Sequence, residues 1–285
     1  MENGISVKGL NKKYSGLQLA DVSFAIPAGC VAGFIGLNGQ GKTATIRTMF
    51  GLSPKDSEQV FLLDHNMDKN MDKVKDNVGV IFDEAYLYDP LKMKEMKSIV
   101  AKSYTRWDEE KYKRFMKEFF LDENQVIATL SKGDADEIRL ATCPFPSRQL
   151  LNMDEPTSEL DPLVRNQLLG ILSKYMEEDG KGVIYASHIT SDLDKLADIP
   201  VFIHKGEIVF VEDKDHLLES HRIVKGGKKY LMKENKSLFI NLDVTDYSFT
   251  GVINQVDSSK KSIPDMVQER LNVEYLMMAY TERRQ

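Results

Sequence analysis

The sequence predicts an α/β protein with a mostly parallel β-sheet, followed by a small C-terminal α+β unit. Up to about residue 220, short apolar runs alternate with helical patterns; after about His221 the runs are short, strand-like and separated by Lys-, Asn- and Ser-rich turns. The length of 285 residues agrees with two domains, because ~150 residues per domain is the usual expectation. We therefore expect one domain over residues 1–220 and an accessory domain over 221–285.

The first elements are expected to be two alternating strands, Ile5 to Leu10 and Val22 to Ile26, joined by a polar turn around Tyr14-Ser15-Gly16. A short buried strand, Cys30 to Ile35, follows. A helix is expected from Thr43 to Phe50, where Gly51 ends the pattern.

A glycine-rich loop connects that strand to that helix. It reads Gly36-Leu37-Asn38-Gly39-Gln40-Gly41-Lys42-Thr43 and fits the phosphate-binding pattern G-x-x-x-x-G-K-[ST] at every required position. Its glycines allow backbone N–H groups to surround an anion, Lys42 can reach the β- and γ-phosphates, and the Thr43 hydroxyl can ligate Mg²⁺. We expect the whole loop and the following Ala44 to bind a nucleoside triphosphate.

A second pattern places two carboxylates at the end of an apolar strand. The run Leu150-Leu151-Asn152-Met153 leads into Asp154 and Glu155, and Pro156 follows. Adjacent strand residues point to opposite sides, so Asp154 is expected in the Mg²⁺ shell while Glu155 polarises a water molecule. An Asp-Glu pair alone would be better explained as a solvated strand end, and the motifs that follow favour the functional reading.

Further elements complete the α/β pattern. A strand from Val78 to Phe82 ends at Asp83, and apolar residues at helical spacing from Leu91 to Ile127 predict a helical subdomain over about 84–142. We then expect a helix from Pro162 to Met176, a strand from Val183 to Ala186 and a helix from Thr190 to Ala197.

The C-terminal unit is predicted from shorter patterns. Strand-like runs are Tyr230-Leu231-Met232, Leu238-Phe239-Ile240 and Thr250 to Ile253, and Asp265 to Tyr280 has the apolar spacing of a closing helix. No function can be assigned to this unit from its sequence.

Three more motifs identify a family: Leu130-Ser131-Lys132-Gly133, Ser158-Glu159-Leu160-Asp161 and Ser187-His188. Together with the phosphate loop and Asp154-Glu155, their order resembles the nucleotide-binding subunit of ABC transporters, with its signature, D-loop and H-loop. The resemblance covers roughly residues 1 to 220. It is strongest to bacterial subunits of the multidrug, lantibiotic and amphipathic-peptide export type, which carry LSKG signatures and H-loops such as Ser187-His188-Ile189-Thr190.

The resemblance implies a P-loop ABC-type ATPase with ATP and Mg²⁺ at its site. It implies that Tyr14 stacks on adenine, and that Ser131 and Gly133 hold the γ-phosphate of ATP bound to a facing protomer. Glu155 would orient or deprotonate water, and His188 would contact the γ-phosphate. Taken alone, an aromatic residue more often packs in a core and a histidine is more often structural; the positions of these two in the motif order favour function.

The chain also departs from the family pattern. Asp83 stands where the Q-loop glutamine is usual; it can still ligate Mg²⁺ but adds negative charge near a triphosphate. Asp134 and Glu137 add charge to the signature region, and Pro144 and Pro146 interrupt the helix expected after it. ATPase efficiency is therefore open on the sequence.

Composition limits the partners. The formal net charge is −6 and no basic tract is concentrated enough for nucleic acid, so nucleic acid is not an expected partner. The two cysteines, Cys30 and Cys143, lack metal-binding spacing. No apolar run reaches the ~18 residues of a membrane span, so a transporter pore would be another chain.

Two functions remain in competition. The first is an ATPase subunit that powers export through a membrane-spanning permease, as a homodimer or a heterodimer with a second ATP-binding subunit. It would be cytoplasmic and peripheral on the inner face of the cell membrane. The second is a catalytically weak, regulatory nucleotide-binding subunit of an asymmetric dimer. A soluble ABC ATPase of DNA repair or translation is disfavoured, because the chain has one phosphate loop and no extended heptads.

Overall fold

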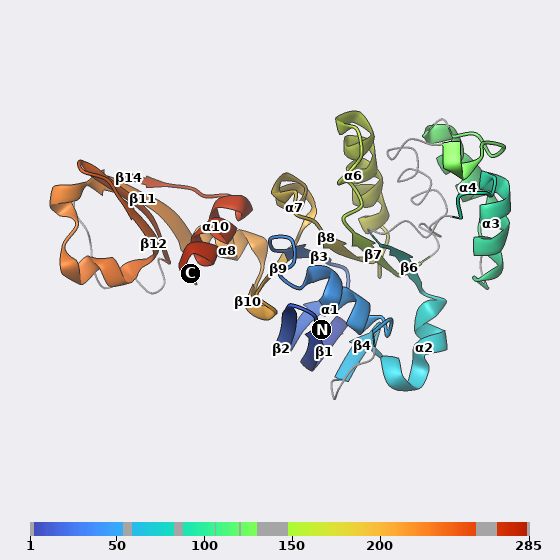
Figure 1. The fold of residues 1–285 in the computed structure, drawn as a ribbon, viewed down its shortest axis with the longest axis horizontal. Helices are drawn as coiled ribbons and strands as arrows, with labels where there is room; N and C mark the ends of the chain where they lie inside the picture. Colours follow the sequence, from blue (N-terminus) through green and yellow to red (C-terminus); the bar gives the residue numbers. More distant parts are fainter. Residues whose placement is uncertain are drawn as a thin grey trace.

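A computed structural model describes residues 3–53, 59–82, 88–105, 107–119, 121–129, 148–254 and 267–283. A six-stranded sheet with the order β10-β9-β3-β8-β7-β6 runs through the middle of the chain (Figure 1). Neighbouring strands are parallel except β9 and β10, which are antiparallel. The strands are β3 (Val31–Ile35), β6 (Val78–Ile81), β7 (Leu150–Asp154), β8 (Gly182–Ala186), β9 (Ile199–His204) and β10 (Glu207–Val211).

The order of the central strands positions the site. Strands β3 and β7 are buried along their whole length, as expected for parallel strands that are covered on both faces. Strand β8 lies between them and is parallel to both. The segments that follow the three strands therefore leave the sheet at the same edge, where open α/β sheets bind ligands.

One face of the central sheet packs against an antiparallel sheet and helix α1. The antiparallel sheet has the order β2-β1-β4-β5. Leu10 of β1, Phe34 of β3 and Ile46 of α1 belong to one hydrophobic core. The elements on this side are β1 (Asn3–Tyr14), β2 (Leu17–Pro27), α1 (Lys42–Met49), β4 (Gln59–Leu62), β5 (His65–Asn66) and α2 (Met67–Lys75).

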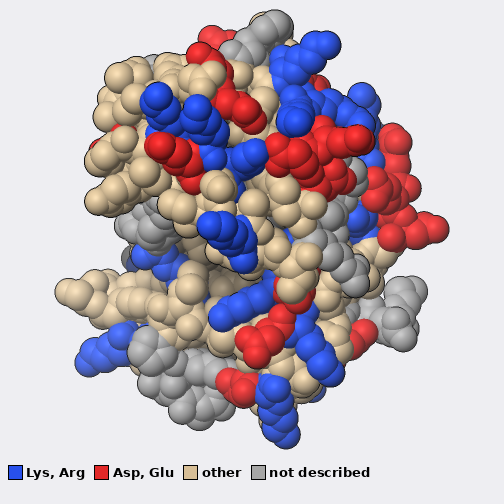
Figure 2. All heavy atoms as spheres, turned by 90° about the vertical axis from the view of Figure 1, so that its right-hand side faces the viewer, with Lys and Arg blue, Asp and Glu red and all other residues tan. Residues whose placement is uncertain are grey.

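A second core contains residues of β7, α6, α7 and the helical region. Leu151, Leu168 and Leu193 belong to it together with Phe115, which stacks on Phe119 at a centroid distance of 4.6 Å. The helices are α3 (Met93–Lys102), α4 (Glu109–Glu118), η1 (Ile127–Thr129), α6 (Pro162–Met176) and α7 (Thr190–Leu196). Figure 2 shows the side of the molecule that carries α3 and α4, where positive and negative side chains are interspersed.

The C-terminal elements form a third sheet, with the order β12-β13-β11-β14, at the opposite end from α3 and α4 (Figure 1). Its helix α10 also reaches α7, because the Val273 N–H donates to Asp194 Oδ1 at 3.1 Å. The elements are α8 (Lys214–Ser220), β11 (His221–Gly227), η3 (Lys228–Tyr230), η4 (Lys233–Leu238), β12 (Phe239–Val244), β13 (Ser248–Asn254), β14 (Val267–Glu269) and α10 (Val273–Arg283).

Two sequence predictions in this unit are wrong. Tyr230 ends a 3-10 turn, so the run Tyr230-Leu231-Met232 is not a strand. The helix predicted over Asp265 to Tyr280 begins only at Val273, because Val267–Glu269 pairs with β11 and the Asn272 side chain accepts a backbone N–H of the first helical turn. In the part of the chain that the structure describes, no helix is long and apolar enough to span a membrane.

Candidate functional site

The phosphate loop lies between β3 and the first turn of α1, and its glycines are required by the backbone. Gly41 precedes α1 with φ of 119°, a conformation that side-chain-bearing residues rarely adopt. A Cβ on Gly36 would lie 2.6 Å from the carbonyl oxygen of Ile203. The loop therefore keeps a close approach to β9 that only glycine permits.

Gln40 connects the loop to the turn between β9 and β10. Its side-chain Oε1 accepts the Lys205 N–H at 2.7 Å, and its carbonyl oxygen accepts the Gly206 N–H at 3.0 Å. Neither Gln40 nor Gly36 lines the cavity beside the loop. Gln40 and Gly36 therefore contribute to the shape of the loop.

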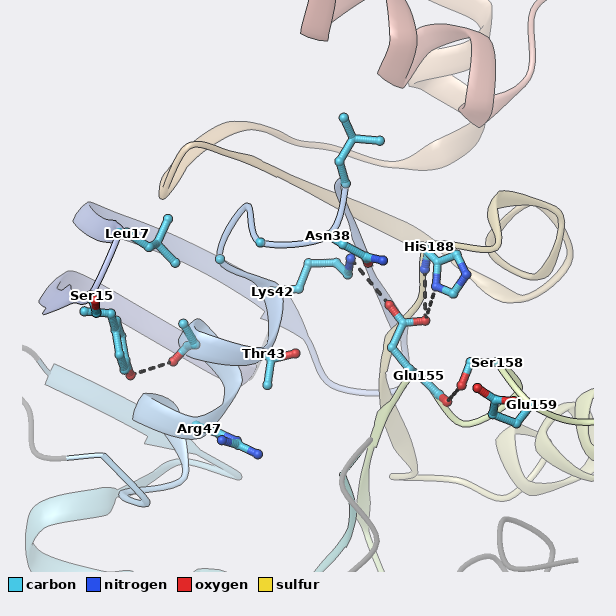
Figure 3. Close-up of a pocket in the computed structure, with 16 residues that line it drawn as sticks. Ser15, Leu17, Asn38, Lys42, Thr43, Arg47, Glu155, Ser158, Glu159 and His188 are labelled. Atoms are coloured by element: carbon cyan, nitrogen blue, oxygen red, sulfur yellow. Dashed lines mark hydrogen bonds and ion pairs between the residues drawn. The ribbon is translucent and has the colours of Figure 1, made fainter. Parts of the chain in front are cut away.

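Three side chains meet beside the loop (Figure 3). Lys42 Nζ donates to the Gly36 carbonyl oxygen at 2.7 Å and lies 3.4 Å from Glu155 Oε1. Glu155 Oε2 accepts the backbone N–H of His188 at 3.1 Å and lies 2.8 Å from His188 Nδ1. Lys42 and Glu155 are nearly buried, while His188 is about half exposed, with side-chain exposures of 5%, 9% and 45%. The sheet order thus brings together residues from three distant parts of the sequence.

The backbone of Glu155 turns sharply after β7. Its φ is 51°, in the left-handed region that a residue with a side chain adopts at a cost of about 1–3 kcal/mol. The Glu155 N–H donates to the carbonyl oxygen of Ala186 at 2.8 Å, and Ser158 Oγ donates back to the Glu155 carbonyl at 3.1 Å. These contacts hold the turn in the conformation that directs the carboxylate towards Lys42.

A cavity of about 740 Å³ opens beside these side chains (Figure 3). It is lined by most of the residues that the sequence predicted for the site: Tyr14, Leu37, Asn38, Gly39, Gly41, Lys42, Thr43, Ala44, Glu155 and His188. Sequence reasoning gave no site role to six further lining residues, although two of them belong to the D-loop motif: Ser15, Gly16, Leu17, Arg47, Ser158 and Glu159. Arg47 could have been found from its spacing, because it lies one helical turn after Thr43.

Tyr14 ends β1 at the cavity wall. Its hydroxyl lies 2.8 Å from Thr48 Oγ1 and donates to the Ala44 carbonyl oxygen at 3.3 Å. The ring is therefore fixed against α1 by its polar end while it lines the cavity. A role in stacking on a base is compatible with this position.

Candidate magnesium ligands come from two elements. Thr43 follows Lys42 at the start of α1 and lines the cavity. Asp154 is the last residue of β7 and is 0% exposed. A hydroxyl and a carboxylate are oxygen donors of the kind that Mg²⁺ prefers, so this donor set fits the ion. The other predicted ligand, Asp83, lies outside the described residues, as do Ser131 and Gly133.

Comparison with known proteins places this site in a family. Residues 19–158, which include the phosphate loop and Glu155, match the family described as ABC transporter. These residues belong to the ABC transporter family. The chain is 27% identical over 266 residues to the uncharacterized ABC transporter ATP-binding protein YhcH of Bacillus subtilis, covering 92% of this chain and 82% of that protein.

Two further likenesses agree with this assignment. The bacitracin transport ATP-binding protein BcrA of Bacillus licheniformis is 26% identical over 253 residues, which cover 87% of this chain and 82% of that protein. A solved ATP-binding subunit of an ABC transporter superposes with a TM-score of 0.68 at 24% identity, over 75% of this chain and 92% of that one. The structural likeness shows the fold, and the relatives in sequence are named ABC transporter or bacitracin transport ATP-binding proteins.

Proposed function

We propose that this chain is the ATP-hydrolysing subunit that powers export of a substrate through a separate membrane-spanning permease. The observation that carries the proposal is the Glu155 carboxylate, which contacts Lys42 Nζ at 3.4 Å and His188 Nδ1 at 2.8 Å beside the cavity. A cation for phosphate, a carboxylate for water and an imidazole thus share one site. The bacitracin transport relative supports transport as the process.

Each side chain has a role that its chemistry allows. Lys42 would bind the β- and γ-phosphates, Glu155 would accept a proton from the attacking water, and Tyr14 would stack on adenine. A carboxylate only accepts hydrogen bonds, so an ionised Glu155 requires a hydrogen on His188 Nδ1. The other ring nitrogen, Nε2, would then donate to the γ-phosphate only when the ring carries both protons.

Magnesium belongs to the same proposal. Thr43, Asp154 and Asp83 would hold the ion, which when bound neutralises charge on the phosphates. Asp83 would also add negative charge near the phosphates, which opposes efficient turnover.

The proposed assembly has two ATP-binding subunits and a permease. Ser131 and Gly133 of one subunit would contact ATP bound to the loop of the other, in a homodimer or a heterodimer. The chain would be cytoplasmic and peripheral on the inner face of the membrane. We assign residues 1–220 to the ATP-binding domain, with a helical subdomain over about 84–142, and 221–285 to an accessory domain.

A catalytically weak regulatory subunit is the alternative, and the acidic residues Asp83, Asp134 and Glu137 favour it. ATP binding and ATP turnover, measured for the chain alone and with its permease in vesicles, separate the two functions. An ATPase subunit binds ATP and turns it over faster with the permease. A regulatory subunit binds ATP, but its turnover stays at the background of the Lys42→Ala variant.

The Lys42→Ala variant tests the phosphate site itself. We expect it to lose ATP binding in a titration with fluorescent ATP, because it removes the cation that contacts the Gly36 carbonyl oxygen of the loop. Lys195→Ala is the control, since Lys195 lies on α7 and contacts Asn166 instead of the cavity. ATP binding by Lys42→Ala as tight as that of the parent would contradict the assignment of the loop.

A further inference from the structure

A buried carboxylate is bonded to residues next to the Glu155 and His188 pair in the fold. Asp192 is 0% exposed and belongs to α7, one helical turn after His188. Its Oδ2 accepts the Thr157 hydroxyl at 2.8 Å and the Tyr185 hydroxyl at 3.0 Å. Its Oδ1 accepts Nε of Arg165 at 2.8 Å and lies 2.6 Å from the NH2 atom of the same guanidinium.

The three partners of Asp192 come from three elements that shape the site. Thr157 lies two residues after Glu155, in the turn that leaves β7. Tyr185 lies in β8, next to the residue whose carbonyl oxygen accepts the Glu155 N–H. Arg165 lies in the first turns of α6 and also donates to Ser191 Oγ at 2.8 Å. One carboxylate thus joins β8, the turn after β7, α6 and α7.

We propose that Asp192 is a positioning residue, which holds the turn of Glu155 and the start of α7 at the separation that the contact between Glu155 and His188 needs. The inference rests on the proposed ATPase function. The left-handed turn at Glu155 costs free energy and needs an anchor, and Thr157 bound to Asp192 is such an anchor. His188 lies two residues before α7, so a shift of α7 moves the imidazole.

The charges in this cluster make the arrangement around Asp192 sensitive to the loss of either partner. Asp192 is fully buried and Arg165 is mostly buried, with 24% side-chain exposure. Removing one partner of such a pair leaves a charge without its counter-ion, which costs more than the pair itself contributes. Burial, and next the negative charge of Asp192, raise the pKa of Tyr185 well above its ordinary value, so this hydroxyl remains a donor even at the alkaline pH where an ordinary tyrosine ionises.

The test compares two pairs of isosteric variants. Asp192→Asn removes the charge, and its control Asp194→Asn makes the same change on the same helix, where the carboxylate accepts the Val273 N–H of α10. Thr157→Val removes the single hydroxyl that joins the Glu155 turn to Asp192. Its control Thr281→Val removes a buried hydroxyl that bonds a carbonyl oxygen within α10. Thr157→Val also keeps the proposal testable if Asp192→Asn does not fold.

Turnover, ATP affinity and melting temperature are measured for each folded variant. We expect kcat to fall about tenfold to a hundredfold in Asp192→Asn and Thr157→Val, since small displacements of reacting groups have effects of this size. KM and the dissociation constant of ATP should change little, because among the described residues the Asp192 carboxylate bonds Thr157, Tyr185 and Arg165 and not the phosphate loop. The controls should keep kcat near that of the parent. A kcat that falls only in proportion to the folded fraction, or falls equally in the controls, would overturn the positioning role.

A second readout does not depend on turnover. The ring signals of His188, assigned by a His188→Ala variant in the NMR spectrum at fixed pH, should shift in Asp192→Asn and Thr157→Val and stay in place in both controls. Unchanged His188 signals in both test variants would overturn the inference. A parent protein that binds ATP without hydrolysing it would contradict the ATPase function, while a His188 shift would still support the link from Asp192 to His188.

Discussion

Replacing Glu155 with glutamine should change ATP affinity and ATP turnover in opposite directions. In the structure Lys42 Nζ lies 3.4 Å from Glu155 Oε1, with both side chains nearly buried. A phosphate group that takes Lys42 as its partner must compete with this carboxylate and approach its negative charge. Glutamine keeps the shape of the side chain and removes both obstacles.

The magnitude follows from the ion-pair distance. Two unit charges 3.4 Å apart interact with about 5 kcal/mol at an effective dielectric constant of about 20. Desolvation of the two buried groups cancels most of this attraction. If about 1.4 kcal/mol remains, Glu155→Gln should bind ATP about tenfold more tightly. Turnover should fall by about a hundredfold or more, because the proton acceptor is lost.

A calorimetric titration with ATP measures the affinity, and the rate of phosphate release measures the turnover. Glu159→Gln is the matched control: it makes the same change of charge at an exposed residue that also lines the cavity. The reasoning is refuted if Glu155→Gln binds ATP no more tightly than the parent, or if Glu159→Gln gains as much. Unchanged hydrolysis in Glu155→Gln would remove this residue from the catalytic role.

Two further predictions concern the stability of glycine variants and the reactivity of the Cys30 thiol. Gly206→Ala should lower the free energy of unfolding by at least about 2 kcal/mol in urea, since φ is +79° and a Cβ would lie 1.9 Å from a backbone oxygen of β2. Gly170→Ala, in open space on α6, should instead raise it by about 1 kcal/mol; equal effects would contradict the argument. Burial, and next two nearby carboxylates, raise the pKa of the Cys30 thiol. In a Cys143→Ser background iodoacetamide should therefore react with Cys30 more slowly at pH 8 than with a free cysteine, and the rate should keep rising at higher pH; a faster rate at pH 8 would contradict a raised pKa.

Elements with local signals were predicted well. The helix predicted from Pro162 to Met176 has these bounds in the structure, because Asp161 caps the Leu163 N–H and proline occupies the first helical position. The phosphate loop carries its own pattern, so its place between a strand and a helix followed from the sequence alone. In both cases the residues that decide the structure are neighbours in the chain.

Features that depend on distant partners were not predictable. Strand β14 exists through pairing with β11, more than forty residues earlier, and its residues alone continue a helical pattern. The 3.4 Å and 2.8 Å contacts of Glu155 depend on the order β3-β8-β7, which no local pattern specifies. The left-handed conformation of Glu155 had no sequence signal either, because glycine or asparagine is the usual mark of that conformation.

The left-handed conformation of Glu155 brings folding stability and function into conflict at one position. Glycine at residue 155 would relieve the left-handed backbone but would leave the nearly buried Lys42 without its carboxylate partner, so the folding free energy at this position is the sum of two opposed effects. An engineering programme that considered only the backbone at this residue would remove the carboxylate between Lys42 and His188. Thermal robustness and usefulness must therefore be scored separately at this residue.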